Sequence, residues 1–317
     1  MRAAILESQG RPLKLVELPD PKPGPDQLLL KVHACGVCRT DLHLRDHEID
    51  ATKLPVVLGH QIVATTDDGR RVGVPWLGWT DGTCKYCTSE RENLCVNGRF
   101  TGRDIDGGYA ELTVADERYC LELPDELSDE DAAPLLCGGL IGYRALTLTG
   151  DAPRLGLYGF GSAAHMICQV AVFQGREVFA FTRPGDERTQ EFARSLGASW
   201  AGGSDETPPE QLDGAIIFAA VGELVPQALS VLAPDGVVVC AGIFMTDIPS
   251  FPYELLYHEH KIRSVTNLTR KDGHEFLAIA PEVPIRTTIT TYELERAEDA
   301  LGDLRAGRFE GTAVIVP

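Results

Sequence analysis

The pattern of hydrophobic and polar positions divides the chain near residue 134. Before that point, short apolar or alternating runs are separated by turn-rich segments such as residues 20–25. This pattern predicts the strands of a small, irregular, Greek-key-like β domain. The predicted strands cover Leu13–Leu18, Gln27–Ala34, Val56–Thr65, Arg71–Pro75 and Ala110–Val114.

After about Pro134, strand-like runs alternate with helix-like runs, which indicates βαβ units on a parallel sheet. The strand-like runs are Leu155–Tyr158, Glu177–Phe181, Ala215–Ala220, Val237–Ala241 and Ile262–Val265, and the helix-like runs are Ala163–Gly175, Glu187–Leu196 and Leu224–Leu232. The last part returns to strand, helix and strand, at Thr287–Thr291, Glu293–Leu304 and Ala313–Val316. We expect this α/β chain to fold as two domains, with the tail rejoining the first.

Size and composition fit a globular protein with two cores, since the chain has 317 residues, 44% hydrophobic and 24% charged. A formal net charge of −18 argues against nucleic acid or an anionic membrane as a partner. No apolar run is as long as a membrane span, and the first residues lack the apolar segment of a signal peptide, so we expect a cytoplasmic protein. Nine clustered cysteines then predict metal binding and core packing, and not a disulfide framework.

Cysteine and histidine side chains cluster at residues 35–43 and again at residues 59–61. Thiolates and neutral imidazoles are ligands that zinc prefers, and Cys137 could supply a third. Two cysteines and one histidine would leave the fourth tetrahedral position open, which distinguishes a catalytic zinc from a structural one. Two other interpretations stay open: Cys35 and Cys38 could form a redox pair, or His60 and Cys137 could be ordinary core residues.

A second cluster, which we call the cysteine lobe, covers residues 81–95 and contains Cys84, Cys87 and Cys95. Its other residues are mostly polar, whereas a core cysteine needs apolar neighbours, so the lobe is predicted to bind a structural zinc. Asp81 precedes Cys84 by the same step that separates Cys84 from Cys87, and we predict it as the fourth ligand. Carboxylate is a harder ligand than thiolate, so the site should be filled but weaker than one with four cysteines.

A glycine-rich turn, Gly159-x-Gly161-x-x-Ala164, follows a predicted strand and opens a predicted helix. In the dinucleotide-binding fingerprint, the first glycine permits the tight turn, the second lets the backbone approach a pyrophosphate, and the third small residue allows close packing. At the end of the next strand, Thr182 and Arg183 stand where an acidic residue would bind the ribose of NAD. A hydroxyl beside a guanidinium suits a 2′-phosphate, so we expect NADP(H) to be favoured over NAD(H), unless Arg183 is simply a solvated loop residue.

Together these motifs resemble the zinc-dependent alcohol dehydrogenases of the medium-chain dehydrogenase/reductase superfamily, over essentially the whole chain. The resemblance is carried by residues 35–43, 59–61, 81–95, 134–139 and 159–165. It implies a GroES-like, β-rich catalytic domain of residues 1–138 and 276–317, interrupted by a Rossmann cofactor-binding domain of residues 139–275. Because bacterial members are often tetramers, we expect a homo-oligomer, either a dimer or a tetramer.

The resemblance also implies roles for individual residues. Cys38, His60 and Cys137 match the catalytic zinc ligands, and Cys35 does not. Thr40 and His43 match a proton relay, Arg39 a residue that faces the cofactor pyrophosphate, and Asp41 a carboxylate that orients the ligand histidine. Trp76 and Leu77 lie where the family lines its substrate pocket, which suggests a medium-sized apolar substrate, with core packing as the alternative.

Four positions depart from the family pattern. Asp81 replaces the first cysteine of the lobe, Gln61 replaces a glutamate, and Ile141 replaces a threonine near the nicotinamide. In addition, the segment 64–73 is shorter than usual, as if a β-hairpin were trimmed. None of these changes removes a catalytic zinc ligand. Gln61 could alter metal exchange or the electrostatics of the pocket, or it could serve only in packing.

The resemblance implies reversible hydride transfer between a small alcohol and a nicotinamide cofactor. Zinc held by two thiolates and a neutral imidazole carries no net charge, so it can stabilise an alkoxide. The proton would leave through Thr40, by a cofactor ribose hydroxyl, to His43 and solvent. Three alternatives stay open: an NADPH-dependent aldehyde reductase, a non-catalytic zinc- and nucleotide-binding protein, and a zinc-free quinone reductase.

Overall fold

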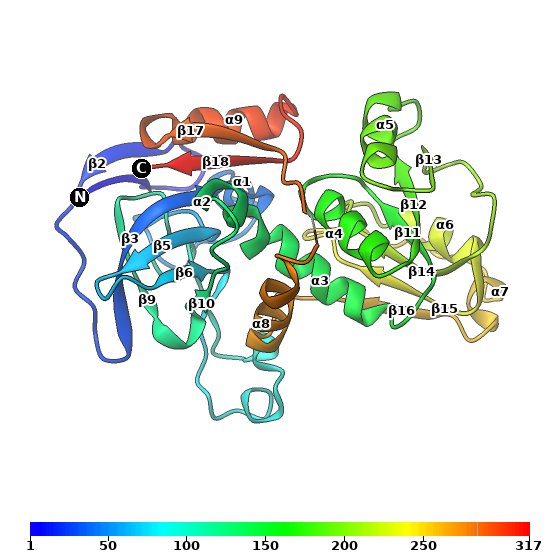
Figure 1. The fold of residues 1–317 in the computed structure, drawn as a ribbon, viewed down its shortest axis with the longest axis horizontal. Helices are drawn as coiled ribbons and strands as arrows, with labels where there is room; N and C mark the ends of the chain where they lie inside the picture. Colours follow the sequence, from blue (N-terminus) through cyan, green and yellow to red (C-terminus); the bar gives the residue numbers. More distant parts are fainter. Residues whose placement is uncertain (284) are drawn as a thin grey trace. The chain divides into compact units, whose positions relative to one another are not determined.

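The computed structural model describes residues 1–283 and 285–317, which form two compact units (Figure 1). Unit 1 contains residues 1–140, 267–282 and 286–317, and unit 2 contains residues 141–266 with residues 283 and 285. The second boundary predicted from the sequence, 275/276, falls inside helix α8 (Arg270–Ile279), which belongs wholly to unit 1. This helix begins at a capping box formed by Thr269 and Asp272, so the chain enters unit 1 just before it.

Strands from both ends of the chain lie side by side in the main sheet of unit 1, whose order is β10-β6-β5-β3-β18-β17, with β9 also paired to β3. These strands are β3 (Gln27–Gly36), β5 (Ile62–Thr66), β6 (Arg71–Val74), β9 (Leu112–Asp116), β10 (Leu121–Glu122), β17 (Ile289–Glu293) and β18 (Thr312–Val316). In Figure 1 the red strand β18 lies beside the blue strand β3, and the two pair antiparallel. The tail therefore rejoins the first part of the chain, as predicted.

Two smaller sheets and several short helices complete unit 1. The sheets are β2-β1-β4, with β1 (Arg2–Leu6), β2 (Lys14–Glu17) and β4 (Val56–Val57), and β7-β8, with β7 (Leu77–Trp79) and β8 (Arg99–Phe100). The α-helices are α1 (Arg39–Arg45), α2 (Asp129–Ala132), α8 and α9 (Ala297–Ala306), and the 3-10 helices are η1 (Cys87–Ser89), η2 (Glu92–Leu94), η3 (Glu117–Tyr119), η4 (Ala133–Leu136) and η5 (Leu294–Arg296). The predicted run Val56–Thr65 is divided between β4 and β5, because Gly59 has a φ of 93° and breaks the extended backbone.

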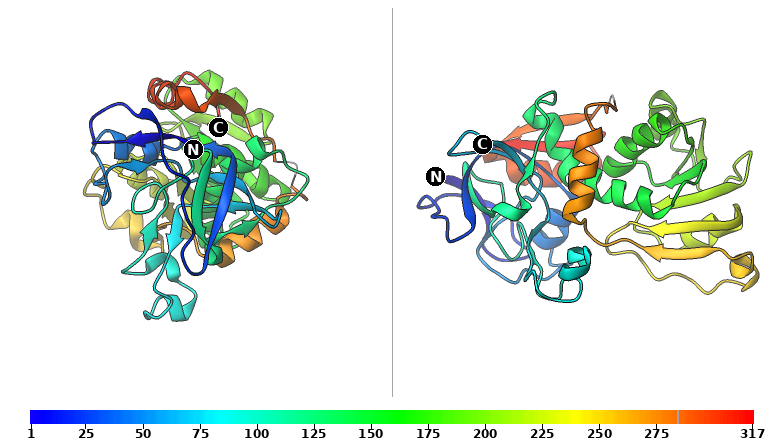
Figure 2. Two further views of the ribbon diagram at one scale, coloured as in Figure 1. Left: turned by 90° about the vertical axis from the view of Figure 1, so that its left-hand side faces the viewer. Right: turned by 60° about the horizontal axis from the view of Figure 1, so that its bottom comes forward.

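Unit 2 is built on a six-stranded parallel sheet in the order β13-β12-β11-β14-β15-β16, whose strands run side by side in Figure 2. The strands are β11 (Arg154–Tyr158), β12 (Glu177–Thr182), β13 (Trp200–Gly203), β14 (Leu212–Ile217), β15 (Leu232–Cys240) and β16 (Lys261–Ser264). This order reverses direction on either side of β11, as in a Rossmann fold, and so places a ligand crevice beyond the carboxyl end of β11.

Five α-helices among the described residues accompany the sheet of unit 2; the middle three match the predicted helical runs, and the first and the last were not predicted. They are α3 (Gly138–Leu148), which spans the first boundary between the units, α4 (Ser162–Phe173), α5 (Glu187–Ser195), α6 (Leu224–Ser230) and α7 (Glu254–Tyr257). Helix α4 contacts β11 and β12, while α6 contacts β14 and β15. Among the described residues, no helix combines the length and the apolar character that a bilayer crossing needs.

Candidate active site and cysteine lobe

The fold brings Cys38, His60 and Cys137 together within unit 1, where one potential ligand atom of each lies within 4.8 Å of the others. Cys38 caps the start of α1, His60 lies between β4 and β5, and Cys137 lies between η4 and α3. The Sγ atoms of Cys38 and Cys137 are 3.8 Å apart. Two ligands at about 2.3 Å from a tetrahedral zinc are separated by about 3.8 Å, so these sulfurs are spaced for one shared ion.

A buried carboxylate, Asp41, holds this cluster in place. Its Oδ1 accepts a hydrogen bond from Nδ1 of His60 at 3.1 Å, and its Oδ2 accepts from the backbone N–H of Cys38 at 2.8 Å. Tyr109 also donates its hydroxyl to Oδ2, at 3.0 Å. When the ring is neutral and Nδ1 of His60 donates, Nε2 carries the lone pair, and this buried atom has no hydrogen-bond partner among the described residues. An orphaned acceptor beside two thiols fits a metal ligand.

The charges around the cluster favour a cation. Burial lowers the pKa of His60, but the adjacent Asp41 carboxylate outweighs this effect and raises it to about 10. The hydrogen bond between the two thiols lowers the pKa of Cys38 and raises the pKa of Cys137, so one thiolate forms readily. Thiolate and neutral imidazole are the ligating forms, and binding of a divalent ion displaces the remaining protons.

The backbone turn before His60 depends on glycine. Gly59 has a φ of 93°, and a Cβ atom there would lie 2.5 Å from the ring of Tyr109 and 2.7 Å from Sγ of Cys35. Any other side chain would therefore collide with the core as well as strain the backbone. Cys35 itself is buried against Gly59 and Gly108, and does not belong to the ligand cluster found among the described residues.

Several other predicted site residues lie next to the cluster. Thr40 is buried, and its Oγ1 accepts a long hydrogen bond of 3.6 Å from the thiol of Cys38. The ring of Trp76 meets that of His60 edge-on, with centroids 4.8 Å apart, and stacks on Phe100 at 5.2 Å. Leu77, in contrast, is only 1% exposed and packs inside the unit. The roles predicted for these residues stay predictions.

His43, Arg39 and Gln61 occupy different surroundings. His43 lies on α1, and its Nδ1 contacts the carboxylate of Glu48, a partner that the sequence motifs did not reveal. Arg39 is exposed at the first position of α1. Gln61 is buried, and its Oε1 has no hydrogen-bond partner among the residues that the structure describes.

The cysteine lobe places Asp81 together with its three cysteines, again with one potential ligand atom of each within 4.8 Å of the others. The Sγ atoms of Cys84 and Cys87 are 3.6 Å apart. The Asp81 carboxylate accepts the backbone N–H groups of Thr83 and Cys84 at 2.9 Å and the side chain of Asn97 at 2.8 Å. These donors lower the pKa of Asp81, so the carboxylate is ionised and already turned toward the cysteines. None of the four ligand candidates is buried.

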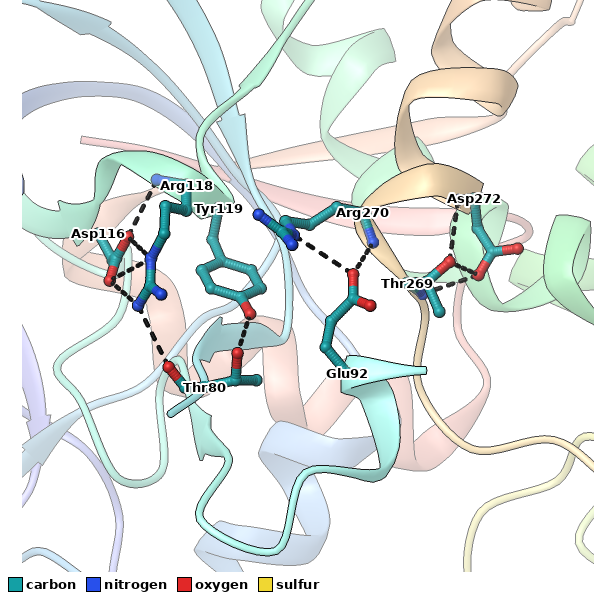
Figure 3. A network of polar contacts seen from close by, with 8 residues as sticks. All are labelled: Thr80, Glu92, Asp116, Arg118, Tyr119, Thr269, Arg270 and Asp272. Atoms are coloured by element: carbon teal, nitrogen blue, oxygen red, sulfur yellow. Dashed lines mark hydrogen bonds and ion pairs between the residues drawn. The ribbon is translucent and has the colours of Figure 1, made fainter. Parts of the chain in front are cut away.

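A polar network ties the ends of the exposed lobe to the rest of unit 1 (Figure 3). Glu92, which is 3% exposed, accepts hydrogen bonds from the backbone N–H of Arg270 at 2.8 Å and from its side chain at 3.3 Å. Since Arg270 is the first residue of α8, this carboxylate also lies at the positive end of the helix. Thr80 and the hydroxyl of Tyr119 are hydrogen-bonded at 2.5 Å. Neither Glu92 nor Tyr119 was singled out by the sequence.

In unit 2, the glycine-rich turn has the geometry of a phosphate-binding loop. Gly159 has a φ of 87°, and a Cβ there would lie 2.9 Å from Ala219. Gly161 caps α4, which has no side-chain cap, and a Cβ at this position would meet no described atom within 4 Å. Ala164 is fully buried. The uncapped helix start and the open space above Gly161 fit a dinucleotide pyrophosphate.

The two residues predicted to select the cofactor differ in exposure. Thr182 is 4% exposed, and its hydroxyl is used inside the unit: it donates to the backbone oxygen of Arg183 at 3.1 Å or Gly202 at 3.3 Å, and it accepts from Gln190 at 3.2 Å. Arg183 is exposed directly after β12. Of the two, Arg183 is therefore the more accessible to a 2′-phosphate, and the predicted role of Thr182 stays a prediction.

Comparisons with known proteins agree with the fold and sites described above. Residues 24–125 match the alcohol dehydrogenase GroES-like domain. A Mycobacterium tuberculosis protein named "Probable alcohol dehydrogenase AdhA" is 45% identical over 323 residues, covering 96% of this chain and 93% of that protein. An alcohol dehydrogenase of Geobacillus stearothermophilus is 32% identical over 336 residues, covering 99% of both. A Sinorhizobium meliloti 1021 structure, assigned as a zinc-binding dehydrogenase and bound to NADP, has a TM-score of 0.87 and 25% identity and covers 100% of this chain and 99% of its own.

Fold and sites together define a nicotinamide-dependent oxidoreductase with a GroES-like unit and a Rossmann unit. The chain belongs to the zinc-type medium-chain alcohol dehydrogenases, as the full-length relatives show. This membership confirms the resemblance, the fold class and the class of enzyme predicted from the sequence.

Proposed function

We propose that this enzyme interconverts alcohols with aldehydes or ketones by zinc-dependent hydride transfer, and that Cys38, His60 and Cys137 hold the catalytic ion. One observation carries the proposal: two thiols and an orphaned, buried imidazole nitrogen converge, and no fourth ligand joins them among the described residues. When bound there, zinc supplies a Lewis acid that lowers the pKa of an alcohol or polarises a carbonyl.

The surrounding side chains suit this chemistry. Asp41 keeps His60 in the tautomer whose Nε2 faces the sulfurs. Thr40, beside Cys38, would take the alcohol proton and pass it on to His43, which would release it to solvent. Trp76 covers the ring of His60 with an apolar surface, which favours an apolar substrate and excludes water.

The cofactor assignment rests on unit 2. The start of α4, with Gly159, Gly161 and Ala164, is proposed to bind the pyrophosphate, and Arg39 is proposed to add a positive charge there. Arg183 supports NADP(H) over NAD(H), because it is exposed where a 2′-phosphate would arrive and no acidic side chain follows β12 directly. A comparison of kcat/KM for both cofactors in the wild type and in R183A tests this preference, and a clear preference of the wild type for NAD(H) would overturn it.

The lobe is proposed to hold a second, structural zinc through Asp81, Cys84, Cys87 and Cys95. Its sulfur spacing and ionised carboxylate support this assignment. The predicted homo-oligomer and cytoplasmic location stay predictions, which sedimentation and fractionation would test.

The central experiment is a panel of alcohols, aldehydes and ketones assayed with both cofactors, alongside measurement of zinc per chain. We expect two zinc ions per chain and turnover of medium-sized apolar substrates in both directions, and the relative rates will show whether aldehyde reduction dominates. Bound zinc without turnover would favour a non-catalytic protein, and full activity without zinc would favour a zinc-free reductase. Either result would overturn the proposal.

A further inference from the structure

His43, the last member of the proposed relay, is paired with a carboxylate from the loop that follows its own helix. Nδ1 of His43 contacts Oε2 of Glu48. The side chain of His43 is 13% exposed and that of Glu48 is 52% exposed, so the contact lies at the edge of solvent. No sequence motif discussed above includes Glu48.

Backbone hydrogen bonds also hold Glu48 close to His43. The carbonyl oxygen of His43 accepts the N–H groups of Glu48 at 2.9 Å and Ile49 at 3.2 Å. Between them, His47 has a φ of 64°, a left-handed conformation that turns the chain back beneath α1. The turn therefore delivers the Glu48 carboxylate to one nitrogen of the His43 ring.

A carboxylate accepts hydrogen bonds but cannot donate them, so Nδ1 of His43 must carry a proton in this contact. The lone pair of the neutral ring then resides on Nε2. We infer that Glu48 is a positioning residue for catalysis, which selects the tautomer and the orientation in which His43 receives protons. The same logic places a carboxylate behind the general base in other enzymes.

Other charged groups on and near α1 pair with different partners. Arg45 contacts Asp46 at 2.7 Å and also contacts Glu298 of α9, while Asp46 contacts Arg305 of α9. Asp41, on the buried side of α1, contacts His60. Glu48 is thus the carboxylate that the structure pairs with the His43 ring.

The inference rests on the proposed function, because it assumes that His43 is part of the relay. During alcohol oxidation, Nε2 takes up one proton, and the resulting imidazolium keeps Nδ1–H on Glu48. Nε2 then releases a proton to water, so the ring returns to the same tautomer. Without Glu48 the neutral ring would populate both tautomers, and the one protonated at Nε2 cannot accept a proton there.

The test uses full-length enzyme with its histidine rings labelled with ¹⁵N, and compares the wild type with E48A and E48L. The His43 resonances are assigned by their loss in H43Q. We expect an Nδ1–H tautomer in the wild type and a mixture in both variants. We also expect kcat to fall about two- to five-fold, the size of effect typical of a half-exposed charge pair, with little change in KM. E48Q, whose amide oxygen still accepts a hydrogen bond, should largely restore the tautomer.

The matched control is D50N, which removes a neighbouring carboxylate that pairs with His47 at 3.2 Å and is far more exposed. It should change neither the His43 tautomer nor kcat. An unchanged His43 tautomer in E48A or in E48L would overturn the inference, whichever of the two variants folds. Failure of the relay itself would appear differently, as an unchanged pH dependence of kcat in H43Q.

Discussion

The two sets of metal-ligand candidates in unit 1 have similar chemistry, but they differ in the spacing of their residues along the chain and in burial. Cys38 and Cys137 are separated by 99 residues and meet around a buried histidine, whereas the four residues of the lobe fall within positions 81–95 and none is buried. In the first set, the fold assembles the ligands and Asp41 fixes the imidazole. In the second, the ligands lie on one loop, so a bound metal must itself help to order the chain. The set around the buried His60 is therefore suited to chemistry, and the set in the lobe to stability.

The largest expected effect comes from the set around His60. Cys38→Ala should lower kcat by about 10³-fold or more, because the loss of a Lewis acid removes several kcal/mol of transition-state stabilisation. Zinc per chain should fall from two to one, as measured by elemental analysis. Cys35→Ala is the matched control: it removes a buried thiol outside the cluster, so kcat should stay near that of the wild type. Wild-type kcat in C38A would contradict the assignment of the active site.

Removing a lobe ligand should affect stability more than chemistry. Cys84→Ala should lose one zinc per chain and lower the free energy of unfolding by several kcal/mol, while kcat falls less than ten-fold. Urea unfolding and elemental analysis measure both effects. Cys120→Ala, which removes a thiol outside both clusters, should retain two zinc ions. If C84A bound as much zinc as the wild type, the lobe would not be a metal site.

A chelator should remove zinc from the two sites at different rates. With a colorimetric chelator, the first zinc should leave the lobe at least about ten-fold faster than the second leaves the cluster around His60, and activity should follow the second. Asp81→Cys should slow only the first release, because a fourth thiolate replaces the harder carboxylate. Loss of activity in step with the first zinc would remove the distinction drawn between the two sites.

The smallest expected effect is the loss of the stability contributed by Asp81 at acid pH. Backbone N–H groups of Cys84 and Thr83, with Asn97, lower the pKa of Asp81, so its contribution to stability is complete above the ordinary carboxyl pKa of about 3.9. That contribution disappears as the pH falls through the lowered value. In protein freed of zinc with a chelator, the stability difference between the wild type and Asp81→Asn should therefore be constant from pH 7 to about pH 5 and shrink in stronger acid. Acid unfolding followed by tryptophan fluorescence measures it; a difference that grew on acidification would contradict the prediction.

The sequence predicted the sites whose residues lie close together in the chain better than those whose residues lie far apart. The lobe and the glycine-rich turn are local, so their spacing alone indicated their chemistry. Most strands and helices of unit 2 were also predictable, because a buried parallel sheet imposes apolar runs on the chain. Strand β13 and helices α3 and α7 were not predicted. The ligand role of Cys137 depended on family resemblance, since no local pattern links it to residues so far away in the chain.

Other features could not be found without coordinates. The hydrogen bond from Tyr109 to Asp41 and that from Arg270 to Glu92 join residues distant in sequence, and isolated polar residues carry no periodicity. The contact between His43 and Glu48 is local, yet it depends on the left-handed backbone conformation of His47. A histidine at this position does not by itself predict that conformation. The division of the run Val56–Thr65 likewise depends on one backbone angle at Gly59.

The position of β18 in the main sheet has a consequence for biosynthesis. Val314 pairs with Gly36, at the end of the strand that leads to Cys38, and β18 lies between β3 and β17. A ribosome therefore releases the inserted Rossmann unit before the sheet that supports the thiols can close. The nascent protein must keep an open strand edge, with its unpaired amide groups, until β18 has emerged.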